Sequence, residues 1–421
     1  MSRIYLDYAS LTPIDPRVLR EMRRYSSPEY ANPSSIYREG VVARKAMGDG
    51  RERIARTIHA HGDEIVFTSG GTEANSLALE GAARAAFRSG NIEPHLIISN
   101  IEHSSIMEAA AMLERQGTEV TRLAVGSDGR VDIGDLRKAI RPETFMISIM
   151  AVNNEIGTIQ PIREIAKEIR AARKRCGQTE KGGQAGQVSR YPLLHTDAAQ
   201  AALYLDLNVE QLGVDLLTLD GSKVYGPRGI GALYVRRGTP IEPIIYGGGQ
   251  EDGMRSSTEN LPAIMGFARA LDIACADHRA FGTKNVPKSQ VREGGGCAGM
   301  RSKESRRLQA LKGIFCAGLK KIHSDIQLNP LGASIDSSTQ IPSILNVSIP
   351  GIDNEFFVLQ LDAAGVAVST KSSCLRDADE SYVLQAIGAD SRTSVRFSFG
   401  RWTRSRDAAT TLRIIAKILK V

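Results

Sequence analysis

Hydrophobic and polar positions follow two alternating patterns along the first 257 residues. Short apolar runs with β-branched residues predict strands, and longer stretches with apolar residues three and four positions apart predict helices. The predicted strands include Leu96–Ser99, Phe145–Met150, Val214–Leu219 and Gly231–Val235, and the predicted helices include Glu73–Phe87, Ser105–Gln116 and Ile162–Arg175. This alternation favours an α/β fold in which helices cover both faces of a mostly parallel sheet.

The pattern changes after about residue 257. Many charged residues and the glycine run at 294–296 predict a polar surface insert at 281–307, and another polar stretch at 176–190 predicts a surface loop. The segments Ile344–Ile349, Val366–Ser369 and Val395–Phe399 then predict the strands of a second, smaller unit.

Composition narrows the class of protein. The chain has 421 residues, of which 42% are hydrophobic and 5% aromatic, and this is typical of a globular protein with a large core. The net charge is +7, but Arg279–Arg307 alone holds eight basic and two acidic residues, so a nucleic-acid-binding face is not expected. The longest apolar runs are too short to span a membrane, and the first residues lack a signal-peptide pattern.

Cysteine usage points to a reducing compartment. The five cysteines include no Cys-x-x-Cys pair, so neither a metal site nor a disulfide framework is expected. We therefore expect a cytoplasmic protein.

A glycine turn at residues 69–72 follows an apolar run and precedes a helical pattern. Ser69 or Thr72 would cap the helix, and Glu73 would sit favourably in its first turn. Backbone N–H groups at such a terminus can bind a phosphate, with glycine allowing close approach. An ordinary capped turn explains the same residues, so both interpretations stay open.

Two further polar residues follow apolar runs. Lys223 lies among Gly and Pro residues directly after the strand predicted at Val214–Leu219, where a lysine can face a crevice and form a Schiff base. Asp197 follows the apolar pair Leu193–Leu194, which indicates a partly buried carboxylate that needs a partner. A surface lysine and a core hydrogen bond are the alternative explanations.

Taken in order, the motifs are similar to those of one enzyme group. They are Thr68–Glu73, Glu102-His103, Val152–Gly157, Asp197–Gln200, Lys223 with Tyr225–Pro227, Gly247–Glu251 and Met254–Thr258. The set resembles the cysteine desulfurases of the class V aminotransferase group, which use pyridoxal 5′-phosphate (PLP) and have fold type I. The resemblance extends from Ile4 to Thr403, apart from the two polar inserts.

The resemblance implies a division into two domains. Residues 15–257 would form a large PLP-binding domain with a mostly parallel sheet. Residues 1–14 and 258–421 would form a smaller α+β domain that carries a catalytic cysteine loop.

The resemblance also implies roles for the residues around the cofactor. Lys223 would be the Schiff-base lysine, and His103 would stack on the cofactor ring and help to move protons. Asp197 would pair with the pyridinium nitrogen. Asn154 and Gln200 would hydrogen-bond the phenolic oxygen of the ring.

The phosphate group has its own set of implied residues. Gly71 and Thr72 would hold it from one subunit, and Thr258 of the partner subunit would join them, so the resemblance implies a homodimer. Asp220 and Ser222 fall at positions that contact the phosphate in the family.

Cys374 lies in Val368–Asp377, which matches the mobile loop of the iron–sulfur and nitrogenase branch of this group. It would attack the sulfur of L-cysteine and become a persulfide, and alanine would be released. Arg396 would bind the substrate carboxylate, and Asn32 would be a second substrate-binding residue. The sulfur would pass to an acceptor protein, such as an iron–sulfur scaffold, or to RNA thiolation.

Three positions depart from the family pattern. Ser222 stands where histidine is common, and Tyr37 stands where the family has another histidine. Asp220 replaces a phosphate-binding serine, and a carboxylate repels a phosphate. Either Asp220 points away or the phosphate site is rebuilt.

Two alternatives stay open. One is a selenocysteine lyase or another class V PLP enzyme. The other is a catalytically weak sulfur-transfer scaffold, which the departures at Asp220 and Ser222 keep open.

Overall fold

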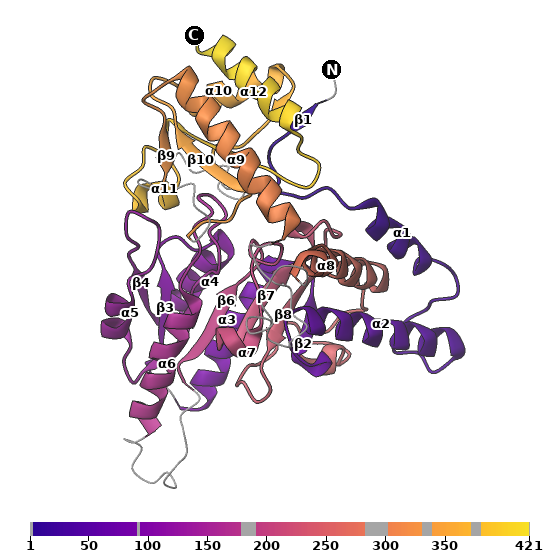
Figure 1. Cartoon of the computed structure of the whole chain (residues 1–421). Coiled ribbons are helices and arrows are strands. Elements are labelled where there is room, and N and C mark those ends of the chain that lie inside the picture. Colours follow the sequence, from indigo (N-terminus) through magenta and orange to yellow (C-terminus); the bar gives the residue numbers. More distant parts are fainter. Residues whose placement is uncertain are drawn as a thin grey trace.

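The computed structural model describes residues 3–90, 93–177, 191–282, 302–330, 339–371 and 380–420. A larger unit is built around one sheet, and a smaller unit beside it carries the N-terminal and C-terminal elements (Figure 1). None of the described helices is long and apolar enough to cross a lipid bilayer.

The large sheet has seven strands, in the order β2-β8-β7-β6-β5-β3-β4. Only β8 runs antiparallel to its neighbours, so the prediction of a mostly parallel sheet is confirmed. The strands are β2 (Ile65–Thr68), β3 (His95–Ser99), β4 (Glu119–Leu123), β5 (Thr144–Ser148), β6 (Leu193–Asp197), β7 (Leu216–Asp220) and β8 (Gly231–Val235).

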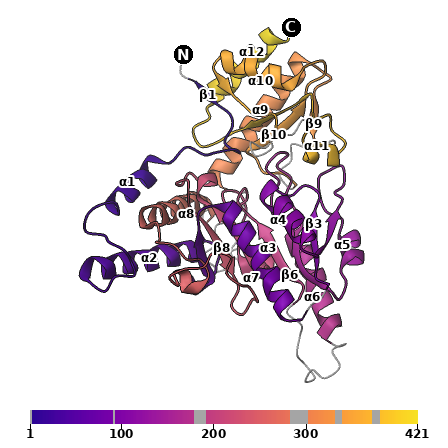
Figure 2. The ribbon, with the colours of Figure 1, turned by 180° about the vertical axis from the view of Figure 1, so that it is seen from behind.

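Both faces of this sheet are covered. In β3, Leu96 and Ile98 pack into one core with α3 (Gly71–Arg88) and α4 (Ser104–Arg115), which lie over the sheet in Figure 2. Ile97 points the other way, into a core shared with α6 (Ile162–Gly177) and α7 (Val209–Leu212). Alternate side chains are buried on opposite faces, which explains why these strands are continuous apolar runs. The short helix α5 (Ile133–Ala139) packs beside β4 and α6.

The smaller unit is α+β. Its antiparallel sheet joins β9 (Gln327–Asn329), β10 (Ile344–Ser348) and β12 (Ser394–Ser398), and β1 (Ile4–Tyr5) pairs in parallel with β11 (Val366–Ala367). Its helices are α9 (Lys303–Ile322), α10 (Asn354–Ala363), α11 (Tyr382–Ala386) and α12 (Ser405–Ile418). All three strands predicted here are present, although β11 is shorter than the apolar run suggested.

Three helices lie at the edge of the large unit, where α8 (Leu261–Gly282) packs against α1 (Pro16–Arg24) and α2 (Arg38–Thr57). The proposed division at residue 257 stays a prediction, and this packing favours grouping α8 with the large sheet.

The limits of the predicted insert at 281–307 are wrong. Helix α8 continues to Gly282, and α9 already begins at Lys303. The Ser302 hydroxyl accepts a hydrogen bond from the Ser305 backbone N–H at 2.9 Å. This N-cap starts a helix inside a charged stretch that resembles a loop in sequence. The other predicted insert, at 176–190, lies almost entirely outside the described residues.

Candidate active site

A cavity of about 170 Å³ lies where β6 and β7 end and α3 begins. The carboxyl ends of parallel strands are the usual site of ligand binding in such sheets. Ten of the residues predicted from the sequence line it: Gly71, Thr72, His103, Asn154, Asp197, Gln200, Asp220, Ser222, Lys223 and Arg396.

Lys223 is held in a tight turn directly after β7. Its Nζ donates a hydrogen bond to the Ala9 carbonyl at 3.2 Å and another to the Ser10 carbonyl. The Thr12 hydroxyl donates to the Ser222 carbonyl at 2.7 Å and accepts from the Tyr225 backbone N–H at 2.8 Å. The N-terminal segment therefore fixes the turn that presents the lysine.

Asp197 is the last residue of β6, and only 7% of it is exposed. Its Oδ1 accepts from the Ala199 backbone N–H at 2.9 Å, and its Oδ2 accepts from Asn75 Nδ2 at 2.8 Å. Gln200 follows closely and donates to the Ala9 carbonyl at 2.8 Å. Burial with two hydrogen-bond donors fixes the orientation of the Asp197 carboxylate.

A chain of hydrogen bonds joins Asp197 to His103. Asn75 Nδ2 also donates to Ser105 Oγ at 2.8 Å, and Ser105 Oγ lies 2.9 Å from His103 Nδ1. The Ser105 backbone N–H donates to the same ring nitrogen at 3.2 Å. Because Nδ1 accepts, we assign the proton of the neutral ring to Nε2.

Asn75 and Ser105 were not assigned roles from the sequence. Asn75 lies one helical turn beyond Thr72 of the glycine turn, and Ser105 follows His103 by two positions. Those two spacings are the only signals that would have suggested them.

Glu102 is fully buried beside His103. Its carboxyl accepts from the Met150 backbone N–H at 3.0 Å and from the Ser99 hydroxyl. Burial raises the pKa of Glu102 to about 8, and the neighbouring Asp197 charge adds to this effect. Burial therefore favours the neutral form of Glu102, which would add little negative charge next to Asp197.

Asp220 points toward the start of α3. Its Oδ2 accepts from the Gly71 backbone N–H at 2.9 Å, and its Oδ1 accepts from the Ser222 N–H and hydroxyl at 2.7 and 2.6 Å. The prediction that Ser69 or Thr72 caps α3 is wrong, because Gly70 is the N-cap residue and no cap side chain bonds there. The carboxylate from β7 takes that place. In this structure the Asp220 carboxylate therefore points toward the start of α3 and not away from it.

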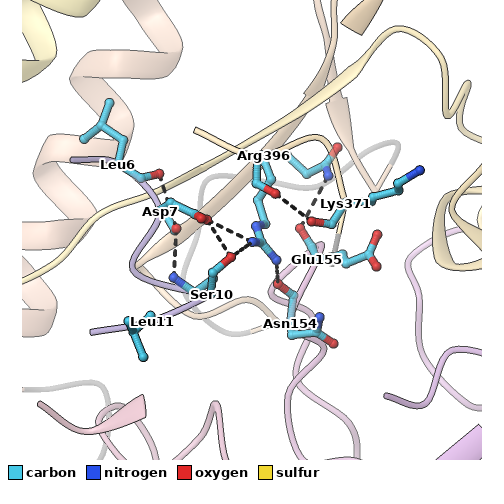
Figure 3. Close-up of polar contacts among 12 residues, drawn as sticks. Leu6, Asp7, Ser10, Leu11, Asn154, Glu155, Lys371 and Arg396 are labelled. Carbon is cyan, nitrogen blue, oxygen red and sulfur yellow. Dashed lines mark hydrogen bonds and ion pairs between the residues drawn. The ribbon is translucent and has the colours of Figure 1, made fainter. Parts of the chain in front are cut away.

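Arg396 lies on β12 and is 1% exposed. Figure 3 shows Asp7, Ser10 and Asn154 around its guanidinium. Its Nη2 pairs with Asp7 Oδ1 at 2.9 Å and donates to Ser10 Oγ at 2.7 Å. Its Nη1 donates to the Asn154 carbonyl at 2.8 Å, and its Nε has no hydrogen-bond partner among the described residues. The guanidinium is thus positioned by three neighbours, which use three of its five N–H donors.

Three predicted residues are not seen at the cavity. The side chains of Asn32 and Thr258 are exposed and do not line it in this chain. Cys374 lies outside the described residues. Within the described ranges, no group of three or more His, Cys, Asp or Glu residues could hold a metal ion.

Comparisons with known proteins agree with this geometry. The model of the family "Aminotransferase class-V" matches residues 4–176 and 184–285. "Cysteine desulfurase IscS" of Dictyoglomus turgidum is 38% identical, over 99% of this chain and 94% of the relative. "Cysteine desulfurase, mitosomal" of Encephalitozoon cuniculi is 36% identical, over 96% of this chain and 84% of the relative.

Solved structures give the same result. A "NIFS-LIKE PROTEIN" superposes with a TM-score of 0.82 at 29% identity, and 99% of each chain is covered. The structure titled "SspA in complex with cysteine" matches with a TM-score of 0.71 at 32% identity, over 94% of this chain and 98% of the other.

The sheet, the cavity and these matches define a class V aminotransferase with the fold of the fold-type-I PLP enzymes. The chain belongs to this family, and within it to the cysteine desulfurases. The fold and family expected from the ordered motifs are confirmed.

Proposed function

We propose that this chain is a PLP-dependent enzyme that converts L-cysteine to L-alanine and transfers the sulfur to Cys374. One observation carries the proposal: Lys223, Asp197 and His103 line a single cavity together with Arg396. Each residue alone has an ordinary structural explanation. No ordinary structural role explains why these residues, from four separate parts of the chain, meet at one cavity.

The cavity residues fit the ring of the cofactor. The buried Asp197 carboxylate suits a protonated ring nitrogen, and Asn154 and Gln200 suit the phenolic oxygen. The Lys223 amine would hold the cofactor covalently through a Schiff base. At the phosphate end, the Gly71 N–H and the Ser222 donors form an anion cradle, which Asp220 fills in this structure. When bound, PLP supplies an electron sink that allows bonds at the substrate's α and β carbons to break.

The chain's own side chains would supply the remaining steps. Arg396 would orient the substrate carboxylate, and the N–H at His103 Nε2 would hold a proton for transfer. The Cys374 thiol and L-cysteine would give alanine and a Cys374 persulfide. The Cβ–S bond breaks, an S–S bond forms, the β carbon is reduced and gains a proton, and the sulfur is oxidised.

The proposal extends to partners and location. The persulfide would pass to an acceptor such as an iron–sulfur scaffold protein, or to RNA thiolation, in the cytoplasm. The exposure of Thr258 is compatible with a homodimer in which Thr258 of the partner subunit reaches the phosphate.

A visible spectrum taken before and after addition of L-cysteine tests this function. We expect a yellow protein that forms alanine and, with a thiol present, sulfide in equal amounts. Lys223→Ala should lose the visible band. Cys374→Ser should keep the band and hold no persulfide, whereas normal sulfide release by Cys374→Ser would remove this cysteine from the mechanism.

A further inference from the structure

The start of α3 is an anion cradle that already contains an anion. Three donors converge on the Asp220 carboxylate, namely the Gly71 N–H at 2.9 Å, the Ser222 N–H at 2.7 Å and the Ser222 hydroxyl at 2.6 Å. Two of them come from the turn before Lys223, and the third comes from a helix that begins 149 residues earlier.

Asp220 is held by dipoles and not by a cation. Among the described residues, no ion pair joins Asp220 to a basic side chain. Glu73, in the first turn of the same helix, pairs with Arg255 Nε at 2.7 Å. The N–H groups and the positive end of an 18-residue helix therefore stabilise the Asp220 charge. These are the groups that stabilise a phosphate at a helix N-terminus.

Glycine at position 71 favours the close fit of the carboxylate. A Cβ atom built on Gly71 would lie 3.1 Å from Asp220 Oδ2 and 3.5 Å from its Cβ. The absence of a side chain at Gly71 lets the carboxylate approach the helix end.

We propose that Asp220 is a built-in competitor for the cofactor phosphate, and that PLP binds this chain only when the Asp220 carboxylate leaves the cradle. Two anions cannot share the same three donors, and a carboxylate that stays nearby repels the phosphate. Asp220 thus sets how much the phosphate contributes to cofactor affinity. That PLP is the ligand rests on the proposed function. The contacts of Asp220 with the three donors are observed independently of it.

The first experiment needs no PLP. The melting temperature of the cofactor-free full chain is measured in sodium phosphate and in sodium chloride of equal ionic strength. We expect phosphate to stabilise Asp220→Ala and Asp220→Asn more than the unmodified chain, because those variants leave donors for an external anion. Glu73→Gln is the matched control, since it removes a charge from the same helix turn without opening the cradle. Equal phosphate stabilisation in all four proteins would overturn the proposal.

The second experiment compares PLP with pyridoxal, which lacks the phosphate, by titration of the visible band. The preference for PLP over pyridoxal should rise at least about tenfold in Asp220→Asn relative to the unmodified chain and Glu73→Gln. An unchanged preference would overturn the proposal even if PLP binds. If no protein develops a band but phosphate still stabilises only the Asp220 variants, the proposed function fails and the occupied cradle stands.

Discussion

Asn75 connects two side chains that are assigned different tasks. One amide nitrogen donates to both Asp197 and Ser105, and Ser105 in turn contacts His103 Nδ1. The orientation of the Asp197 carboxylate and the tautomer of His103 therefore depend on the same amide. In a buried site, such a network fixes geometry that a single pair would leave loose.

Replacing Asn75 tests this dependence. Asn75→Ala should lower kcat for alanine formation by about tenfold, since a charge-assisted hydrogen bond contributes about 1.5 kcal/mol or more. The KM for L-cysteine should change little, because among the described residues the Asn75 amide bonds to Asp197 and Ser105 and not to Arg396. Ser105→Ala should lower kcat by a similar factor. The Asn75→Ala/Ser105→Ala double variant should have a kcat only slightly lower than that of either single variant. Ser104→Ala is the control, and an equal loss there, or fully additive losses, would contradict the network.

The sequence predicted the positions of Asp197 and Lys223, but not what holds them. Asp197 ends one buried strand and Lys223 lies in the turn after another, so the local pattern was sufficient. Asn75 lies 122 residues from Asp197, and Gly71 lies 149 residues from Asp220, so neither contact leaves a local signal. The cap of α3 was predicted wrongly for the same reason, since the capping carboxylate comes from another strand. The role of Cys374 stays a prediction.

At the scale of elements, the N-terminal segment links the two units. Its strand β1 pairs with β11, Asp7 pairs with Arg396 on β12, and Thr12 bonds on both sides of Lys223. A short stretch that precedes the first helix thus sets the position of Arg396 relative to the turn that presents Lys223. Apolar periodicity cannot show this, because the segment is too short to have a period.

Thr12→Val measures the strength of this link. The change keeps the shape of the side chain but removes two buried hydrogen bonds, so we expect the free energy of unfolding to fall by about 2 kcal/mol. Thr411→Val is the matched control, since the buried Thr411 hydroxyl donates only to the Asp407 carbonyl within α12, at 2.8 Å. Urea titrations of the three proteins give the comparison. A loss in Thr12→Val no larger than in Thr411→Val would show that the link adds no stability of its own.

At the scale of the whole molecule, the beginning of α2 exposes apolar side chains that we would expect a monomeric protein to bury. Ile36 is 91% exposed, Tyr37 54% and Val41 50%. An apolar residue just before a helix N-cap often packs against the first turn of that helix. Ile36 has this position before α2, but its side chain faces outward. Adjacent exposed apolar residues mark a surface that contacts another protein. We expect this surface to belong to the homodimer that the proposed role of Thr258 would require.

Ile36→Asp tests the dimer and the cavity together. A charge in an apolar interface should shift the protein from dimer to monomer in analytical ultracentrifugation. If Thr258 of the partner subunit contacts the phosphate, the affinity for PLP should fall with the dimer fraction, because each cavity then lacks a donor. Leu359→Asp is the control, since Leu359 is 65% exposed on α10, in the smaller unit away from α2 (Figure 1). If Ile36→Asp is monomeric and its PLP affinity is unchanged, each cavity is complete within one chain. If Ile36→Asp stays dimeric, the subunit contact lies elsewhere on the surface.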